Sequence, residues 1–271
     1  ADMADLFGDG GGAPSERPRA SAAAVDDRND RSRPLADRLR PRQLGEVVGQ
    51  EHLTGEGGVL SRMLEATSLG SMIFWGPPGT GKTTVARLLA HEVDYAFEQI
   101  SAIFSGVADL KKMFEAARLR RSNGRRTLLF VDEIHRFNKA QQDVILPHVE
   151  DGTLVLMGAT TENPSFEVVS PLLSRSRVFT LNALTEEQVE EILRRAIEDR
   201  ERGLGALNAG VDPDAMRALV TLANGDARVA LNALELSTAG TNPDEQGNRK
   251  ITVAVIQDAM QQRSLRYEKD G

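Results

Sequence analysis

The stretch that decides the fold is Gly76-Pro77-Pro78-Gly79-Thr80-Gly81-Lys82-Thr83-Thr84. It fits G-x-x-x-x-G-K-[ST], the pattern of a phosphate-binding P-loop. The apolar run 71–75 before it is typical of a short buried strand, and residues 85–90 after it are typical of a helix. The glycines therefore stand between a strand and a helix, which is the context that the motif requires.

In that context the backbone N–H groups of the loop can surround a triphosphate, and the helix N-terminus adds its partial positive charge. We predict that Lys82 reaches the β- and γ-phosphates and that the Thr83 hydroxyl holds Mg²⁺. All loop residues from 76 to 84 are candidates for nucleotide contact. Taken alone, the loop has one alternative interpretation, a glycine-rich turn with a solvated lysine.

A second motif, Thr127-Leu128-Leu129-Phe130-Val131-Asp132-Glu133, is a continuous apolar run that ends in two acids. Such a run suits a central parallel strand covered on both faces. Asp132 at its carboxyl end is predicted to face Thr83 and complete the Mg²⁺ site. Glu133 is predicted to orient and deprotonate an attacking water. The alternative is that two acids simply end a buried strand, and the preceding P-loop argues against it.

Composition limits the class of protein. The chain of 271 residues contains no cysteine, which excludes disulfides, thiolate metal sites and cysteine nucleophiles and is compatible with a reducing cytosol. No apolar run approaches the roughly 18 residues of a membrane span, and the N-terminus lacks a signal-peptide pattern. The net charge is −7, so contact with nucleic acid has to come from a local patch.

Polar residues also follow other predicted strands. The strand 152–161 ends in hydroxyls at Thr160 and Thr161, which could sense a γ-phosphate or could mark a plain strand-to-turn transition. Arg175 and Arg177 precede a short strand. Arginine keeps its charge in any environment, and its guanidinium can bind phosphate through two hydrogen bonds. The alternative for both is a surface arginine. Upstream of the P-loop, Val48-Gly49 either lines an adenine or belongs to an ordinary surface turn.

From Thr185 onward helical patterns dominate, at 189–200, 213–223, 226–237 and 253–261, with a polar loop at 242–250. Arg228 stands near the start of one of these helices. The predicted fold is therefore an α/β P-loop domain with a parallel sheet, at 34–182, followed by a small all-helical lid domain at 183–262. Residues 1–33 are too poor in large apolar residues to fold and are predicted to be a disordered tail. Leu6-Phe7 in this tail is either incidental or a short docking peptide.

Three further local expectations follow from the sequence. A proline at 147 inside the helical pattern that begins at Asn138 predicts a kink or an early end. His135 and His148 lack metal-ligand spacing and are predicted to be structural. The densest basic patch precedes the strand 127–133 and thus lies at the edge opposite the nucleotide, where a solvated loop is expected and DNA contact is the alternative. It comprises Arg118, Arg120, Arg121, Arg125 and Arg126.

The motifs occur in the order found in AAA+ ATPases, and the resemblance is closer than that superfamily. Five segments look like the replication-associated recombination protein A family, which is related to clamp loaders and to the eukaryotic Werner-helicase-interacting ATPase. The resemblance covers about Pro34 to Gly271. Its segments are 34–41, 48–53, 74–79, 132–143 and 158–166.

The resemblance implies ATP and Mg²⁺ as ligands and a role for single positions. Lys82 and Thr83 resemble the Walker A pair, and Asp132 and Glu133 resemble Walker B. Thr161 looks like the sensor 1 position, with Thr160 as the other candidate. Arg175 looks like the arginine finger for a neighbouring subunit's ATP, but Ser176 replaces the cysteine of the clamp-loader motif, so Arg177 stays a candidate. Arg228 looks like sensor 2.

The resemblance also implies an ATPase that remodels DNA at stalled or damaged replication forks, in the cytoplasm at the nucleoid and away from membranes. DNA contact is expected at the loop Phe104-Ser105-Gly106-Val107 with Lys111, Lys112 and Lys139. Single-strand-binding protein and a sliding clamp are candidate partners. Relatives form tetramers through a C-terminal domain, and residues 263–271 look like the approach to it.

Two rival functions stand beside this one. The first is a clamp-loader-like subunit that remodels proteins and touches DNA only incidentally. The second is a nucleotide-gated scaffold with little turnover, which the presence of Glu133 disfavours because a non-hydrolysing switch needs no such base. A P-loop kinase is disfavoured too, since a two-acid strand and an arginine-bearing lid suit hydrolysis between subunits.

Overall fold

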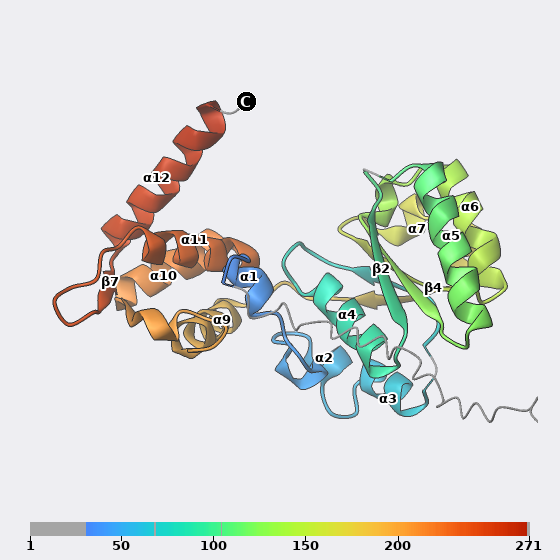
Figure 1. Ribbon diagram of the computed structural model, residues 1–271, viewed down its shortest axis with the longest axis horizontal. Coiled ribbons are helices and arrows are strands. Elements are labelled where there is room, and N and C mark those ends of the chain that lie inside the picture. The colour runs from blue at the N-terminus through green and yellow to red at the C-terminus, as the bar shows by residue number, and fades with distance from the viewer. Residues whose placement is uncertain (1–30, 68, 104, 270–271) are drawn as a thin grey trace, which may run out of the picture.

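A computed structural model describes residues 31–269 apart from positions 68 and 104, with side chains described up to residue 264. The predictions for residues 1–30, including the one for Leu6-Phe7, lie outside the described residues. Two bodies make up the described chain, an α/β unit and a helical unit, joined side by side (Figure 1). Within the described part, no helix is both long and apolar enough to cross a membrane.

The α/β unit is built on one parallel sheet of five strands, in the order β2-β3-β4-β1-β5. Strands β3 and β4 are buried along nearly their whole length, as expected for central strands with continuous apolar runs. Because all strands are parallel, their carboxyl ends meet at one edge of the sheet, where ligands bind in such folds. The predicted parallel sheet is confirmed. The strands are β1 Met72–Trp75, β2 Ala96–Ser101, β3 Thr127–Asp132, β4 Leu154–Thr160 and β5 Arg177–Thr180.

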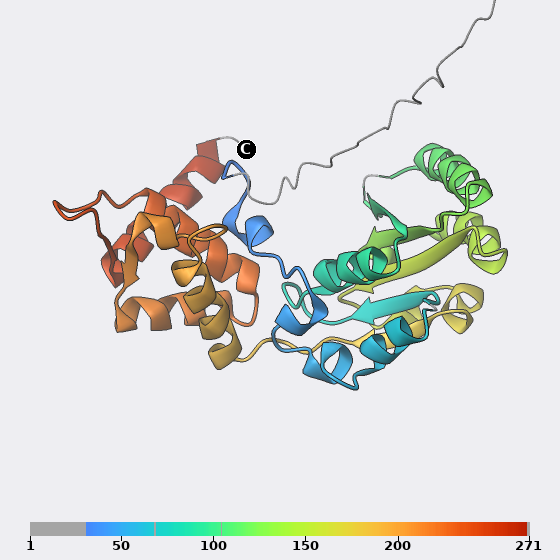
Figure 2. The same cartoon turned by 60° about the horizontal axis from the view of Figure 1, so that its bottom comes forward.

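Helices cover both faces of the sheet, and each face has its own apolar core (Figure 2). On one face lie α2 Glu51–Thr54, α3 Val59–Glu65 and α4 Lys82–Glu92. On the other lie α5 Val107–Ser122, α6 Lys139–Glu150 and α8 Ser170–Ser174. Short elements connect these at η2 Leu44–Glu46, η3 Ile134–Arg136 and α7 Pro164–Glu167.

Helix α6 excludes one of the two outcomes expected for the proline at 147, a kink or an early end. It contains Pro147 and yet continues to Glu150, so the early end does not occur. Proline removes only one backbone donor, and the carbonyl that loses its partner belongs to Asp143, an exposed residue whose backbone water can reach. At its start, Asn138 and Gln141 form the capping box that their spacing predicts.

The helical unit packs four helices around an apolar core, namely α9 Glu186–Glu198, α10 Pro213–Ala223, α11 Ala227–Ala239 and α12 Val253–Lys269. The predicted helical lid is confirmed with one addition. Strands β6 Ala209–Val211 and β7 Arg249–Ile251 pair in parallel, so part of the expected polar loop at 242–250 is a strand. A short turn, η4 Gly205–Leu207, precedes β6.

The chain crosses between the two units twice. Helix α1 Leu35–Arg38 lies against α11 (Figure 1), and Leu35 is fully buried in the core of the helical unit. Its amide donates to Glu235 Oε2 at 3.0 Å, and Arg38 Nε donates to the Arg202 carbonyl at 2.9 Å. The domain boundary predicted from the sequence puts residue 35 in the α/β unit, and this is wrong, because the Leu35 side chain packs with the lid. We call residues 39–47, which run from α1 to the α/β unit, the strap.

Candidate nucleotide-binding site

The P-loop connects β1 to α4 through two glycines in the left-handed region, Gly79 at φ +73° and Gly81 at φ +100°. Glycine adopts these angles at little cost. The turn leaves Lys82 and Thr83 in the first turn of α4, where free backbone N–H groups and the helix dipole favour an anion. The local geometry is that of a phosphate cradle.

Lys82 lies over this loop. Its Nζ donates to the carbonyls of Gly76, at 2.8 Å, and Pro77, at 2.6 Å. Burial, followed by the positive charge of Arg228, lowers the pKa of Lys82 to about 8, against the opposing effect of Asp132 and Asp226. A group that bears negative charge at this position would stabilise the ammonium, so the loop fits a phosphate.

A cavity of about 280 Å³ opens between the P-loop, the carboxyl edge of the sheet and the lid. It brings together most of the residues that the sequence nominated, and Thr83 and Asp132 share its wall, which suits a Mg²⁺ ion held by oxygen ligands. Gly49, Gly76 and Pro77 are not part of the lining. The nominated residues that do line it are Val48, Pro78, Gly79, Thr80, Gly81, Lys82, Thr83, Thr84, Asp132, Glu133, Thr160, Thr161 and Arg228.

Glu133 follows β3 in an unusual backbone conformation, with φ +52°. The Glu133 amide donates to the Asp132 carboxylate at 3.0 Å. Asp132 is the last residue of β3, Glu133 follows it, and both residues line the cavity. The Oε2 atom of Glu133 is closed to solvent and lies 3.0 Å from Arg136 Nε. The two groups form an ion pair that lacks the alignment of a hydrogen bond.

The two threonines at the end of β4 differ in environment. Thr160 is buried, and its hydroxyl lies 2.9 Å from His135 Nδ1 and accepts from the Glu162 amide. Thr161 is exposed at the cavity. The hydroxyl of Thr160 is thus engaged within the protein, and Thr161 faces the ligand space. His135 serves this local bonding, while His148 stacks on Phe114 with ring centroids 4.0 Å apart.

Arg228 extends from the first turn of α11 into the same cavity. Its side chain is 58% exposed, and its guanidinium pairs with Asp226 at 3.4 Å. Asp226 also caps the helix by accepting from the Arg228 amide. Asp226 therefore both caps the start of α11 and holds the Arg228 side chain at the cavity.

Arg175 and Arg177 lie elsewhere. They stand at the beginning of β5, and since β5 is parallel to β1, this is the edge opposite the P-loop. Arg175 pairs with Glu150 at 2.9 Å and donates to the Pro171 carbonyl at 2.9 Å. Neither arginine lines the cavity of its own chain, so a role at ATP requires a second subunit.

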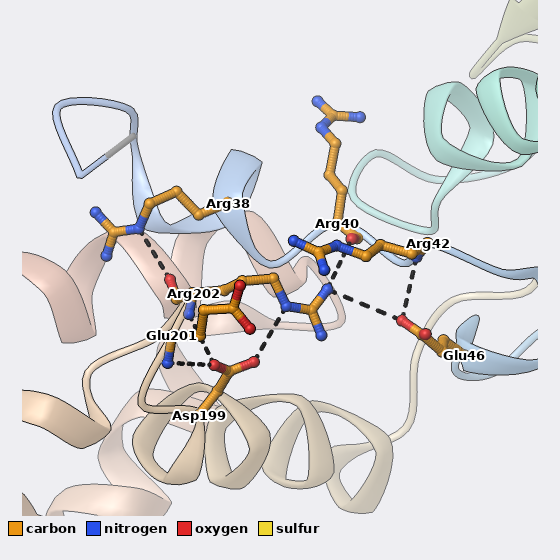
Figure 3. A network of polar contacts seen from close by, with 7 residues as sticks. All are labelled: Arg38, Arg40, Arg42, Glu46, Asp199, Glu201 and Arg202. Atoms are coloured by element: carbon orange, nitrogen blue, oxygen red, sulfur yellow. Dashed lines mark hydrogen bonds and ion pairs between the residues drawn. The ribbon is translucent and has the colours of Figure 1, made fainter. Parts of the chain in front are cut away.

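Some residues that line the cavity are not predicted from the sequence, because they come from segments about 160 positions apart, chiefly α1 and the strap on one side and α9 and the loop after it on the other. Figure 3 shows their polar network. Arg202 pairs with Asp199 at 3.1 Å and approaches Glu46 of the strap at 4.0 Å. Burial alone would raise the pKa of Asp199, but hydrogen bonds from the backbone amides of Arg202 and Glu201 and from the Arg202 guanidinium lower it. The missed lining residues are Ala36, Asp37, Leu39, Arg40, Pro41, Glu46, Val47, Leu184, Ile192, Arg195, Asp199, Arg202, Ala227 and Leu231.

The basic patch at the far edge is largely committed to neighbours on the α/β unit. Arg120 pairs with Glu98, and Arg125 with Asp94 at 3.3 Å. Arg121 donates to the Asp151 carbonyl, and Arg126 lies over the Tyr95 ring. These contacts favour a structural role for the patch.

The other basic surface lies at the carboxyl edge. Lys139 and Lys111 are exposed, as is Lys112, and Gln141 Nε2 donates to the Ser105 carbonyl at 2.9 Å, which ties α6 to the loop after β2. Phe104 of this loop lies outside the described residues.

Comparison with known proteins agrees with this geometry. Residues 39–171 match the family model described as "Holliday junction DNA helicase RuvB P-loop domain", and residues 205–271 match "AAA C-terminal domain". The Thermotoga maritima RuvB Holliday junction branch migration motor superimposes with a TM-score of 0.62 at 27% identity, over 82% of this chain and 72% of that one.

Two curated relatives have a higher sequence identity to this chain than the Thermotoga maritima structure has. Replication-associated recombination protein A of Escherichia coli (strain K12) is 47% identical over 251 residues, 93% of this chain and 56% of that protein. ATPase WRNIP1 of Dictyostelium discoideum is 38% identical over 88% of this chain and 29% of that protein. The chain thus spans about half the length of the first of these relatives, and less of the second.

The parallel sheet, the P-loop, the two-acid strand and the arginine-bearing lid define an AAA+ ATPase, a class whose ligands are ATP and Mg²⁺. The residues around the cavity fit that pair. Within the class, the chain belongs to the family of replication-associated recombination protein A, as the sequence predicted.

Proposed function

We propose that this chain binds ATP with Mg²⁺ between the P-loop and the lid and hydrolyses it. One observation carries the proposal: a single cavity is lined by the phosphate loop, by Asp132 and Glu133, by Thr161 and by Arg228 of the lid. Each is a residue type that hydrolysis of a phosphoanhydride requires. The similarity to a relative named ATPase WRNIP1 supports it.

In this proposal the loop amides and Lys82 hold the phosphates, and Thr83 and Asp132 hold Mg²⁺. The ion would neutralise charge on the phosphates. Glu133 takes a proton from the attacking water. Thr161 reports on the γ-phosphate, and Arg228 draws the lid toward it. The adenine lies against Val48 and the strap.

We propose further that the active unit is an assembly, a tetramer when the C-terminal part of the family is present. Support comes from Arg175, which stands at the edge opposite its own P-loop and is 44% exposed. In a ring or tetramer this arginine would reach the ATP of the next subunit. An arginine at a transferring phosphoryl group accelerates the reaction by about 10³-fold or more.

The proposed substrate is DNA at stalled or damaged replication forks, which places the protein in the cytoplasm at the nucleoid. The name of the Escherichia coli relative supports a replication and recombination role, and the Thermotoga maritima neighbour is a branch migration motor for Holliday junctions. Single-strand-binding protein and a sliding clamp are the proposed partners.

Steady-state ATP turnover tests the proposal. It is measured without DNA, with single-stranded DNA and with forked duplex, for the parent chain and for the variants Lys82→Ala and Arg175→Ala. Turnover that DNA stimulates and that both substitutions abolish supports a DNA-dependent motor with a finger in trans. Turnover that ignores DNA but responds to a sliding clamp favours the clamp-loader-like function. Nucleotide binding without turnover, in a longer chain as well, favours the scaffold.

A further inference from the structure

A side-chain hydrogen bond joins the turn that follows β3 to the turn that follows β4. The His135 ring, on η3, lies with its Nδ1 atom 2.9 Å from the hydroxyl of Thr160, the last residue of β4. Thr160 is 1% exposed, and its hydroxyl also accepts from the Glu162 amide at 2.9 Å and lies 3.1 Å from the Glu162 carbonyl. A hydroxyl has one hydrogen and two lone pairs, so these neighbours use it fully within the protein.

Each of the two turns carries one group of the proposed reaction. Glu133, the proposed general base, immediately precedes η3 and stands two residues before His135. Thr161, which faces the ligand space, follows Thr160 directly. A general base acts only when the water that it deprotonates lies within hydrogen-bond reach, and that water must also reach the γ-phosphate. The bond between His135 and Thr160 therefore constrains the position of the base relative to the residue that faces this phosphate.

A second contact holds the same turn against the same strand. Ile134, next to His135 in η3, is fully buried, and a Cβ on Gly158 of β4 would lie 2.9 Å from its Cδ1 atom. A larger side chain at Gly158 would push the turn away from β4. The turn thus packs against the strand through one residue and hydrogen-bonds to it through the next.

The backbone at the base explains why such contacts are needed. Glu133 has φ +52°, in the left-handed region that residues other than glycine seldom adopt. A residue persists in this conformation only when the surrounding structure holds it there. The contacts of Ile134 and His135 with β4 supply this constraint, since they fix the two residues that follow the base.

We propose that His135 is a positioning residue for the proposed hydrolysis. Its hydrogen bond to Thr160 holds Glu133 and Thr161 at the spacing at which a water between them attacks the γ-phosphate. The loop amides and Lys82 hold ATP independently of this bond, so the bond acts on the chemical step and not on binding. This inference rests on the proposed function, since it assumes that Glu133 is the base.

The first test is steady-state ATP turnover by His135→Leu and His135→Asn. Leucine removes the bond, so kcat falls about 10- to 100-fold, as expected when a catalytic group is misplaced by about 1 Å, and KM for ATP is unchanged. Asparagine places an amide near the position of Nδ1 and restores most of kcat. His148→Leu is the matched control and keeps the parent kcat, because that histidine stacks on Phe114 near the other end of α6. Parent kcat in His135→Leu, or equal losses in His135→Leu and His135→Asn, overturns the proposal.

The second test is a double-variant cycle, which separates positioning from a general loss of structure. Thr160→Val removes the hydroxyl and keeps a β-branched side chain of similar shape. If the two side chains act through one bond, the double variant His135→Leu/Thr160→Val has the kcat of Thr160→Val alone. Losses that multiply show that His135 acts by another route and overturn the proposal. Gly158→Ala displaces the same turn through Ile134, so it should lower kcat at unchanged KM with both hydrogen-bonding side chains present.

The third test needs no turnover. In the nucleotide-free protein, ¹⁵N NMR of the four histidine rings follows the Nδ1 signal of His135, which is assigned by its loss in His135→Asn. Thr160→Val should shift this signal, and an unshifted signal refutes the bond and the proposal with it. A chain that binds ATP without turning it over refutes the proposed function instead, and the NMR experiment still measures the bond.

Discussion

Gly79 of the P-loop lies directly against Asp226 of the lid: a methyl group built on Gly79 would overlap the Asp226 carboxylate and lie 2.9 Å from its Cα. The same carboxylate caps α11 and holds Arg228. The phosphate loop and the lid are thus in contact through the residue that positions the lid arginine. We therefore expect a shift of the loop on nucleotide binding to move Asp226 and, with it, Arg228.

This contact makes Gly79→Ala damaging for two separable reasons. The φ of +73° costs an alanine roughly 1–2 kcal/mol, and the methyl group also pushes Asp226 and the lid away. Gly57→Ala is the matched control, since Gly57 has φ +72° but open space around it. We expect both variants to lose unfolding free energy and only Gly79→Ala to lose affinity for a fluorescent ATP analogue. Equal affinity in the two variants would show that the loop and lid are not coupled.

Nucleotide affinity should depend on pH through Lys82. Its pKa of about 8 in the free protein lies below the 10.5 of the unfolded chain, so between these values the unfolded state binds more protons and the free energy of unfolding rises with pH from this group. Bound phosphate stabilises the ammonium, so ATP binding above pH 8 takes up a proton. Affinity then falls as pH rises through 8, by at most about tenfold per pH unit.

Titration calorimetry in buffers of different ionisation enthalpy measures this proton uptake directly. Lys82→Arg is the control, because arginine stays charged over the whole range. An affinity that is flat from pH 7 to 9.5 in the parent chain would mean that Lys82 does not touch the phosphates.

The arginine finger can be assigned by mixing inactive subunits. Lys82→Ala keeps its finger but cannot hold ATP, and Arg175→Ala holds ATP without a finger. If Arg175 acts in trans, a mixture of the two regains part of the turnover that each lacks. The same mixture made with Arg177→Ala decides between the two arginines, and recovery with neither would mean that the β5 edge does not complete a neighbouring site.

Leu35 links the lid core to the strap, so Leu35→Ala should have two effects. It leaves a cavity in the lid and lowers the free energy of unfolding by about 2–5 kcal/mol. It also loosens α1, and with it the strap that lines the nucleotide cavity, so ATP affinity falls. Leu219→Ala, in the same core, is the control. In chemical denaturation it should lower the free energy of unfolding by a similar amount, and in an ATP-binding assay its affinity should equal that of the parent chain.

By itself, the sequence determined the parallel sheet, the P-loop, the helical lid and the family. These follow from local patterns, such as the glycine spacing of 76–84 and the apolar run that ends at Asp132, and the structure and the relatives confirm them. Neighbours in the chain fix the side chains within one turn or at one strand end, so the spacing of these residues in the sequence predicts their arrangement. The capping box at Asn138 is of this kind.

Only the tertiary structure decided which distant segments share the cavity. Leu35 packs in the lid rather than in the α/β unit, and Arg202 reaches Glu46 of the strap. Burial against a partner that is remote in sequence, or the direction in which an exposed arginine extends, produces no periodic pattern in the sequence and so cannot be predicted from it. Packing between the two units selects these contacts, and that packing exists only after the chain has folded.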